Sequence, residues 1–229
     1  MNMKKLVMMA LAAVLAVPGF AQIESEPIYT SPNGVATFDM FNHLGFGYNA
    51  VQSADYKPAF SSDIFLNVLK VGVYPAEWLG LELGVDLEFN DFSSRESAFA
   101  LVNDKIQAVD FQVLGLGNTF DRKSSDFSVF SLSAPVLVKG RFGKIQLGAG
   151  AVASWNITGT TSAFLRQGNR DLNYSERKAK VNPFSYGIMA TVSYGGVGLF
   201  CKFYPKSSHL LPEGSVDFSY TTVGFALGL

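Results

Sequence analysis

The feature that most constrains this chain is a run of strict alternation that begins after Trp78. From Leu79 to Phe89 every second residue is apolar, and the residues between them are glycine or acidic. A period of two puts the two sets of side chains on opposite faces of a β-strand. We expect such a strand to have an apolar medium on one face and a polar medium on the other.

The same period appears from Ile145 to Trp155 and from Phe184 to Tyr194. Five further segments indicate strands with less regular alternation, at roughly residues 42–52, 61–74, 127–140, 197–205 and 216–229. Most of these segments are long enough for a tilted membrane crossing, which takes about 9–11 residues. We therefore predict an all-β fold, a transmembrane antiparallel up-and-down β-barrel of eight strands, preceded by a cleaved signal peptide.

The connections between the segments alternate between short and long. Short links are expected at Pro75–Glu77, Arg141–Phe142 and Gly195–Gly196, whereas the longest connections cover about residues 91–126 and 156–183. Short turns at one end and long loops at the other are typical of outer-membrane barrels. Both termini are then expected in the periplasm.

The short links also predict the registers of three hairpins. In each register the apolar face of one strand meets the apolar face of its neighbour, and a slip of one residue would break the match. The registers are Tyr194 opposite Val197, Val138 opposite Ile145, and Tyr74 opposite Trp78. The third one points Asn67 toward the apolar side, unless a β-bulge shifts that strand.

The composition is that of a chain that exposes apolar surface. Hydrophobic residues make up 48% of the sequence and charged residues 16%, whereas average soluble domains carry about 25% charged residues. The longest apolar run, Leu6–Val17, is too short for a membrane-spanning helix, which needs about 20 residues. A formal net charge of −1 gives no indication of nucleic-acid binding, and the hydrophobic content excludes a disordered chain.

The N-terminus has the features of a secretory signal peptide. Lys4 and Lys5 precede the apolar run, and small residues at Gly19 and Ala21 predict cleavage after Ala21. The alternative is an N-terminal anchor helix, for which the apolar run is short. The predicted organisation is a signal peptide at 1–21, a periplasmic lead at 22–40 and the barrel at 41–229.

The polar face of the strands indicates which side of the barrel is apolar. A soluble barrel would carry many lysines and glutamates outside, whereas this face is largely Gly, Ser and Thr, which suit a narrow lumen. We therefore expect the apolar face to meet lipid, and a lipocalin-like periplasmic barrel is the alternative. Aromatic residues near the strand ends predict two membrane-interface girdles. They are Tyr74, Trp78, Phe89, Trp155, Phe184, Tyr186 and Tyr194.

Charged residues also point into the predicted lumen. The acidic ones lie on the most regular strand: Glu82, Asp86 and Glu88. Candidate basic partners on other strands are Lys70, Lys139 and Lys202. Such a set can form an ion-selective path or an internal salt-bridge network. We favour the network, because an eight-stranded barrel has room only for side chains and unpaired charges there are costly.

Candidate catalytic residues are few. The two histidines are His43 and His209, and His209 follows Ser207 and Ser208 in a predicted loop. Nucleophilic catalysis needs a serine, a base and an orienting group in fixed geometry, which adjacency in a loop does not supply. We therefore predict no enzymatic activity. No cofactor or metal is expected, because the sequence has no metal-ligand spacing and no nucleotide-binding motif.

The connection at 91–126 has two interpretations. Ser93 and Glu96 have capping-box spacing, so a short amphipathic helix would place four apolar residues on one face: Phe99, Val102, Ile106 and Val109. Alternatively, segments near 97–103 and 106–117 form a hairpin, which extends above the membrane or raises the strand count to ten. Loops of this length are usually functional or mobile.

The second long connection, at 156–183, is basic. Its cations are Arg166, Arg170, Arg177, Lys178 and Lys180. They can meet the phosphates of lipopolysaccharide or form a solvated loop without a partner.

The layout resembles the small outer-membrane β-barrel proteins of Gram-negative bacteria, the OmpX-like and porin-family group, over essentially the whole mature chain. The last strand carries Thr222, Gly224, Leu227 and Leu229, which looks like the C-terminal signal read by the barrel-assembly machinery. It departs from the commonest form because it ends in Leu229 instead of an aromatic residue. The resemblance implies an outer-membrane location, contact with membrane lipid and lipopolysaccharide, and assisted insertion, whereas functions within the group differ.

The sequence therefore predicts an integral outer-membrane barrel with a structural or surface-interaction role. Its loops are candidates for binding an extracellular ligand. A small-solute or lipid permeation barrel is the alternative function. A lipid-modifying enzyme centred on His209 is a third.

Overall fold

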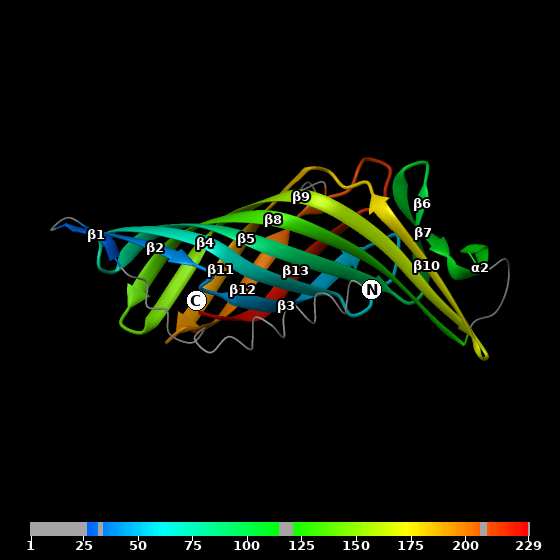
Figure 1. The fold of residues 1–229 in the computed structure, drawn as a ribbon, viewed down its shortest axis with the longest axis horizontal. Coiled ribbons are helices and arrows are strands. Elements are labelled where there is room, and N and C mark those ends of the chain that lie inside the picture. The colour runs from blue at the N-terminus through cyan, green and yellow to red at the C-terminus, as the bar shows by residue number, and fades with distance from the viewer. Residues whose placement is uncertain (1–26, 32–33, 115–120, 207–209, 229) are drawn as a thin grey trace.

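The computed structural model describes residues 27–31, 34–114, 121–206 and 210–228. The predicted signal peptide lies outside the described residues, as do His209 and Leu229. The described chain is an elongated barrel, with further strands projecting beyond its two ends (Figure 1).

Within the described residues, eight antiparallel strands close into a ring. β13 pairs with β3 from Leu227–Leu44 to Phe218–Ser53, and this seam joins the last strand to the first. The predicted eight-stranded barrel is therefore confirmed. In ring order the strands are β3 (Leu44–Ser53), β4 (Ser62–Ala76), β5 (Leu79–Ser94), β8 (Arg122–Phe142), β9 (Ile145–Gln167), β11 (Phe184–Tyr194), β12 (Val197–Tyr204) and β13 (Phe218–Leu227).

The two ends of the barrel differ in the length of their connections (Figure 1). We call the end with the short β4–β5, β8–β9 and β11–β12 connections the turn end, and the opposite end, which has the long connections, the hairpin end. At the hairpin end β8 and β9 continue past the ring, and β10 (Arg170–Ala179) pairs with β9 to make a three-stranded extension. Much of the predicted loops at 91–126 and 156–183 is therefore strand. Many polar side chains on both faces of these segments remove the alternation that marks the other strands.

The first strand of the barrel begins earlier than predicted. β1 (Pro27–Ser31) and β2 (Gly34–Met40) form a hairpin at the turn end, and β2 pairs with β4. β3 continues the pairing with β4 after an interruption at 41–43, where Phe41 has a φ of 50°. Residues 34–40, expected in a lead before the barrel, therefore belong to its sheet.

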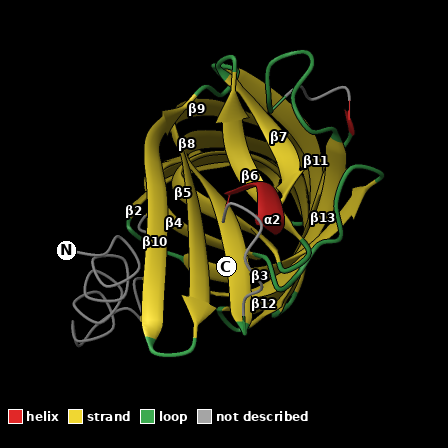
Figure 2. Ribbon diagram, turned by 90° about the vertical axis from the view of Figure 1, so that its right-hand side faces the viewer, coloured by secondary structure: helices red, strands yellow, loops and turns green. Residues whose placement is uncertain are grey.

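The connection between β5 and β8 contains the predicted hairpin. β6 (Ser97–Val102) pairs with β7 (Lys105–Asp110) in a separate two-stranded sheet, followed by the single-turn helix α2 (Phe111–Leu114). The amphipathic-helix interpretation of this segment is wrong, and so is the ten-stranded barrel. The hairpin and α2 lie over the open end of the ring (Figure 2). No helix in the described part of the chain is long and apolar enough to cross a membrane.

The β11–β12 register is the predicted one. Tyr194 lies opposite Val197, and the turn consists of Gly195 and Gly196. Their φ values of 58° and 86° belong to the left-handed region, which glycine adopts at no steric cost. Two-residue turns with positive φ match the twist of the strands that they join.

The β8–β9 register differs from the predicted one. Phe142 lies opposite Ile145, so Val138 faces Ala149 and the predicted turn at Arg141–Phe142 is wrong. The chain turns instead at Gly143, which has a φ of 63°. Apolar residues still meet on one face, because the error is an even number of residues and preserves the alternation.

The β4–β5 register also differs, because the chain turns at residues 77 and 78 and not at Pro75–Glu77. Pairing continues as far as Ala76, so Tyr74 does not lie opposite Trp78 as predicted. The register shifts between Asn67 and Leu69, where the extra residue turns the Asn67 side chain into the barrel. Asn67 is fully buried there, which removes the conflict noted from the sequence.

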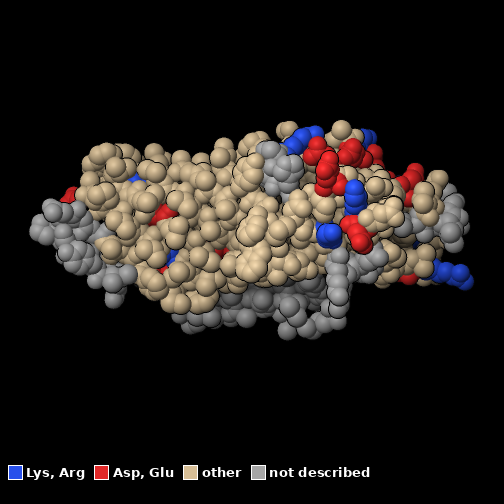
Figure 3. Space-filling model, turned by 90° about the horizontal axis from the view of Figure 1, so that it is seen from above, with Lys and Arg blue, Asp and Glu red and all other residues tan. Residues whose placement is uncertain are grey.

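Side chains alternate between the lumen and the exterior along the ring strands. In β11 the even-numbered residues are exposed and the odd-numbered ones are buried. In Figure 3 the charged side chains gather at the hairpin end, whereas most of the visible wall consists of other residues. Exposed apolar side chains of the ring strands include Leu81, Val138, Leu147, Ile188 and Leu199. A soluble monomer seldom exposes an apolar patch larger than a few hundred Å², so this exterior is the reverse of a lipocalin-like barrel.

Candidate functional site

Two groups of buried charges occupy the lumen. The first is centred on Lys202, whose Nζ lies 2.9 Å from Asp63 Oδ2 and 2.9 Å from Glu88 Oε1. The three side chains come from β12, β4 and β5 and are at most 1% exposed. One ammonium group therefore joins three strands across the lumen. We call these three residues the Lys202 cluster.

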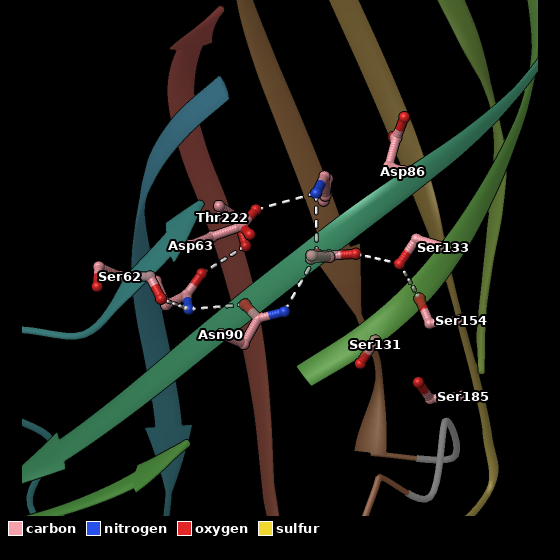
Figure 4. Close-up of polar contacts among 12 residues, drawn as sticks. Ser62, Asp63, Asp86, Asn90, Ser131, Ser133, Ser154, Ser185 and Thr222 are labelled. Atoms are coloured by element: carbon pink, nitrogen blue, oxygen red, sulfur yellow. Dashed lines mark hydrogen bonds and ion pairs between the residues drawn. The ribbon is translucent and has the colours of Figure 1, made fainter. Parts of the chain in front are cut away.

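Hydroxyl and amide groups complete the Lys202 cluster (Figure 4). Ser133 Oγ donates to one carboxylate oxygen of Glu88, and Asn90 Nδ2 donates to the other at 3.1 Å. Asn49 donates to Asn90 Oδ1 at 3.0 Å and accepts from Thr222 Oγ1 at 2.6 Å. A buried carboxylate requires such partners, because burial without them is costly.

An aromatic layer lies on the turn-end side of this cluster. The Lys202 ammonium is 4.2 Å from the centre of the Phe65 ring, and Phe200 packs edge-on against Phe65 with ring centroids 5.0 Å apart. Both rings are buried. Gly45 leaves room for Phe65, since a Cβ at position 45 would lie 2.1 Å from the ring. The rings and the ammonium therefore fill this cross-section of the barrel.

The second group lies nearer the turn end and is centred on Glu82. Lys139 Nζ is 3.4 Å and Arg141 Nη2 is 3.9 Å from its carboxylate, and the Tyr74 hydroxyl donates to it. The Arg141 guanidinium also stacks 3.6 Å above the Tyr74 ring. We call these four residues the Glu82 cluster. Tyr74 was predicted in a membrane-interface girdle; that prediction is wrong, because Tyr74 is buried on the inward face of β4, which it shares with Gly72.

Asp86 lies between the two groups. Its Oδ1 accepts a hydrogen bond from Asn67 at 2.7 Å and is 4.0 Å from His43 Nε2. The other ring nitrogen of His43 is 2.8 Å from Asn42 Oδ1. A cavity of about 20 Å³ beside these groups has room for about one water molecule. Among the described residues, no three His, Cys, Asp or Glu side chains are grouped as metal ligands.

The six predicted lumen charges all lie inside the barrel, but they form no single site. Glu88 and Lys202 belong to the first group, Glu82 and Lys139 to the second, Asp86 lies between them, and Lys70 is 3.7 Å from Asp39. The sequence did not indicate Asp39, Asp63 or Arg141. Arg141 stood in a predicted turn and Asp39 in the predicted lead. Asp63 falls on the same face of its strand as the apolar Phe65, so the sequence did not indicate whether that face is polar or apolar.

The other predicted girdle residues lie on the exterior. Trp78 and Tyr194 are exposed near the turn end, and Trp155, Phe184 and Tyr186 are exposed toward the hairpin end. Phe89 is partly exposed. In the C-terminal strand, Leu227 faces outward, Thr222 is buried on Asn49, and a Cβ at Gly224 would contact the carbonyl oxygen of Phe46.

Seven aromatic rings close the lumen at the hairpin end. Neighbouring centroids are 4.6–6.3 Å apart. We call them the mouth cluster: Tyr56, Phe92, Phe99, Phe127, Tyr204, Phe218 and Tyr220. Phe99 belongs to β6, so the β6–β7 hairpin forms part of this closure (Figure 2).

The exposed charges of the hairpin end include local pairs. Arg166 donates to both carboxylate oxygens of Asp171, at 2.6 and 2.9 Å. These hydrogen bonds hold the pKa of Asp171 below its ordinary value. Lys206 pairs with Asp217 at 3.0 Å. Arg166 therefore has an acidic partner within the chain, whereas Arg170 and Lys180 are exposed.

Comparisons with known proteins assign no family. No family model matches the chain, and no curated protein matches it. Among solved structures, it is similar to Ail, the attachment invasion locus protein of Yersinia pestis, in complex with the heparin analogue sucrose octasulfate. That match has 12% identity and a TM-score of 0.37, and covers 85% of this chain and 98% of that one. Neisserial surface protein A matches with 12% identity and a TM-score of 0.34, over 82% of this chain and 95% of that one.

Proposed function

We propose that the chain is an integral outer-membrane barrel with a closed lumen, which acts through the structure presented at its hairpin end. The apolar exterior supports a position in hydrocarbon, and exposed aromatic residues at two levels, such as Trp78 and Trp155, suit the two membrane interfaces. This is a surface-interaction role and not a permeation role.

The observation that carries this proposal is the filling of the lumen. The mouth cluster, the Lys202 cluster, the Phe65–Phe200 layer and the Glu82 cluster follow one another along the barrel axis. Lys202 pairs with two acids across the barrel, and Glu82 pairs with two cations of the neighbouring strand, so an ion that entered would have to break these pairs. The cavity beside Asp86 holds about one water molecule, and an eight-stranded barrel leaves little further space.

We further propose that the hairpin end faces the outside, where Arg170 and Lys180 meet lipopolysaccharide phosphates. Both termini would then lie in the periplasm. Export through a signal peptide cleaved after Ala21, and recognition of Thr222, Gly224 and Leu227 by the barrel-assembly machinery, remain predictions. The proposed role is non-catalytic: the His43 ring is buried between an amide and a carboxylate.

Planar-bilayer recording tests the closed lumen. The purified protein should insert without conductance steps. Regular steps that persist in independent preparations would overturn the closed barrel in favour of the permeation alternative. Recovery of the mature protein in the soluble periplasmic fraction would overturn the membrane location.

Labelling in intact cells tests the orientation. In a Cys201→Ala background, a membrane-impermeant maleimide should label Lys180→Cys at the hairpin end. It should not label Lys144→Cys, which is also exposed but stands at the β8–β9 turn. The reverse pattern would show that the turn end faces outward.

A further inference from the structure

The mouth cluster contains rings from two sources. Five stand on strands of the ring: Phe92, Phe127, Tyr204, Phe218 and Tyr220. Tyr56 comes from the connection between β3 and β4, and Phe99 comes from the β6–β7 hairpin. The centroid of Phe99 is 4.9 Å from that of Tyr56 and 6.3 Å from that of Phe127, both in edge-on geometry. Phe99 therefore occupies a site that other aromatic rings line.

The hairpin packs on the barrel without joining the hydrogen-bonded ring. Its two strands form their own sheet. Hydrogen bonds from the Phe99 N–H to Ser125 Oγ, at 2.9 Å, and from the Val216 N–H to the Ile106 carbonyl, at 2.7 Å, tie it to the rest. Each strand of the ring, in contrast, is paired with two neighbours. The hairpin can therefore leave the mouth without breaking the ring, as a local opening below the cost of global unfolding.

The closed mouth leaves the hydroxyls of Tyr56 and Tyr204 without a hydrogen-bond partner among the described residues, and of these two rings it is Tyr56 that contacts Phe99. Tyr56 is 5% exposed, and its hydroxyl has no hydrogen-bond partner among the described residues. Burial raises the pKa of Tyr56, so the hydroxyl stays protonated and able to donate. A buried donor without an acceptor is costly. Phe99, whose ring lies against Tyr56, has no side-chain atom that could accept this hydrogen bond.

We propose that the mouth cluster is a binding site for an aromatic ring that carries a hydrogen-bonding group, and that Phe99 occupies this site when no ligand is bound. A phenol-like ligand would replace the ring contacts of Phe99 and pair with the Tyr56 hydroxyl. That added interaction favours the open hairpin over the closed one, as a ligand-driven shift requires. This site would supply a ligand class for the proposed surface role. That the ligand arrives from outside the cell rests on the proposed function.

Thiol labelling in lipid nanodiscs measures the opening. Two serine-to-cysteine variants on β8 provide a matched pair in the Cys201→Ala background. Ser125→Cys lies under the hairpin, whereas Ser133→Cys lies deeper, beside Glu88; both serines are at most 1% exposed. A water-soluble maleimide should label Ser125→Cys slowly and leave Ser133→Cys unlabelled.

Removing the Phe99 ring should open the mouth. Phe99→Ala should speed the labelling of Ser125→Cys by about 100-fold, the scale of a buried Phe→Ala truncation, with Ser133→Cys still protected. An unchanged rate, or equal labelling at both positions, would overturn the hairpin as the removable occupant. Unheated gel mobility reports whether each barrel is folded. Phe99→Leu, with a smaller increase expected, replaces any Phe99→Ala protein that fails this check.

The ligand class is tested with p-cresol and toluene, which differ by one hydroxyl. p-Cresol should speed the labelling of Ser125→Cys about tenfold more than toluene, the scale of one hydrogen bond to an otherwise unpaired group. Tyr56→Phe should abolish this difference. Equal effects of the two probes, or a difference that survives in Tyr56→Phe, would overturn the site. Conductance of the wild-type protein would overturn the closed lumen but would leave these outcomes unaffected.

Discussion

Replacing Lys202 by methionine should lower the free energy of unfolding by about 4 kcal/mol. Methionine keeps an unbranched chain but removes the ammonium group. Glu88 would retain its bonds from Ser133 and Asn90. Asp63 would lose its donor at Oδ2, and its Oδ1 has no hydrogen-bond partner among the described residues. Two carboxylates would then face each other in a buried site, at the cost of about 3–5 kcal/mol typical of a broken buried pair.

Two further variants separate charge from packing. The triple variant Lys202→Met, Asp63→Asn, Glu88→Gln removes all three charges and should recover most of the loss, because no uncompensated carboxylate remains. Lys139→Met is the matched control, since Lys139 is equally buried. Its partner Glu82 keeps Arg141 and the Tyr74 hydroxyl. We expect this control to lose only about 1–2 kcal/mol.

Urea unfolding in lipid vesicles measures these differences through the fluorescence of Trp78 and Trp155, both exposed on the barrel exterior. Unheated gel mobility confirms that each variant closes its barrel. Equal destabilisation by Lys202→Met and Lys139→Met, or a triple variant no more stable than Lys202→Met alone, would refute the role assigned to the Lys202 ammonium group.

Three other perturbations follow from the geometry. Gly45→Ala should destabilise the barrel in the same assay, because the new Cβ would overlap the Phe65 ring. Adding Phe65→Leu should restore part of the lost stability. An unchanged urea midpoint for Gly45→Ala would contradict this packing. Gly196→Ala should cost about 1 kcal/mol, because its φ of 86° strains an alanine, and a stability equal to the wild type would show that the turn adapts. The pKa of Asp171 in the folded protein is below the ordinary carboxyl value of 3.8. The stabilisation by the Asp171–Arg166 pair is therefore fully present above that value and is lost as pH falls through the lower folded-state pKa. Amide exchange at the β9–β10 tip should therefore quicken over that acid range, relative to the intrinsic rate, in the wild type but not in Asp171→Asn.

The sequence indicated which side chains face lipid or lumen better than it indicated where the strands end. Alternation from Leu79 to Phe89 and along β11 is clear, because every residue that crosses the membrane has an apolar medium on one face of its strand. Beyond the ring, β8, β9 and β10 have polar side chains on both faces, so the pattern loses contrast although the strands continue. The loops predicted at 91–126 and 156–183 reflect this loss.

The lumen was predictable in character but not in its pairing. Alternation placed Glu82, Asp86 and Glu88 inside, yet partners depend on register, and one bulge after Asn67 shifts a whole strand end. Tyr74, which lies near a strand end and was expected in a girdle, faces inward on the same side of β4 as Gly72 and joins the Glu82 cluster. Contacts that join distant strands leave no local pattern in the sequence, which explains why the mouth cluster was missed.

The Lys202 cluster has a consequence for the order in which the strands can enter the membrane. Lys202 is 139 residues from Asp63 and 114 residues from Glu88 along the chain. A partial sheet that held β4 and β5 in the bilayer without β12 would expose both acids to hydrocarbon, or to a lumen that had not yet formed. Charges at the centre of a bilayer are expensive. The strands are therefore expected to insert together. β12 should be in place beside the forming barrel before β4 and β5 are exposed to lipid.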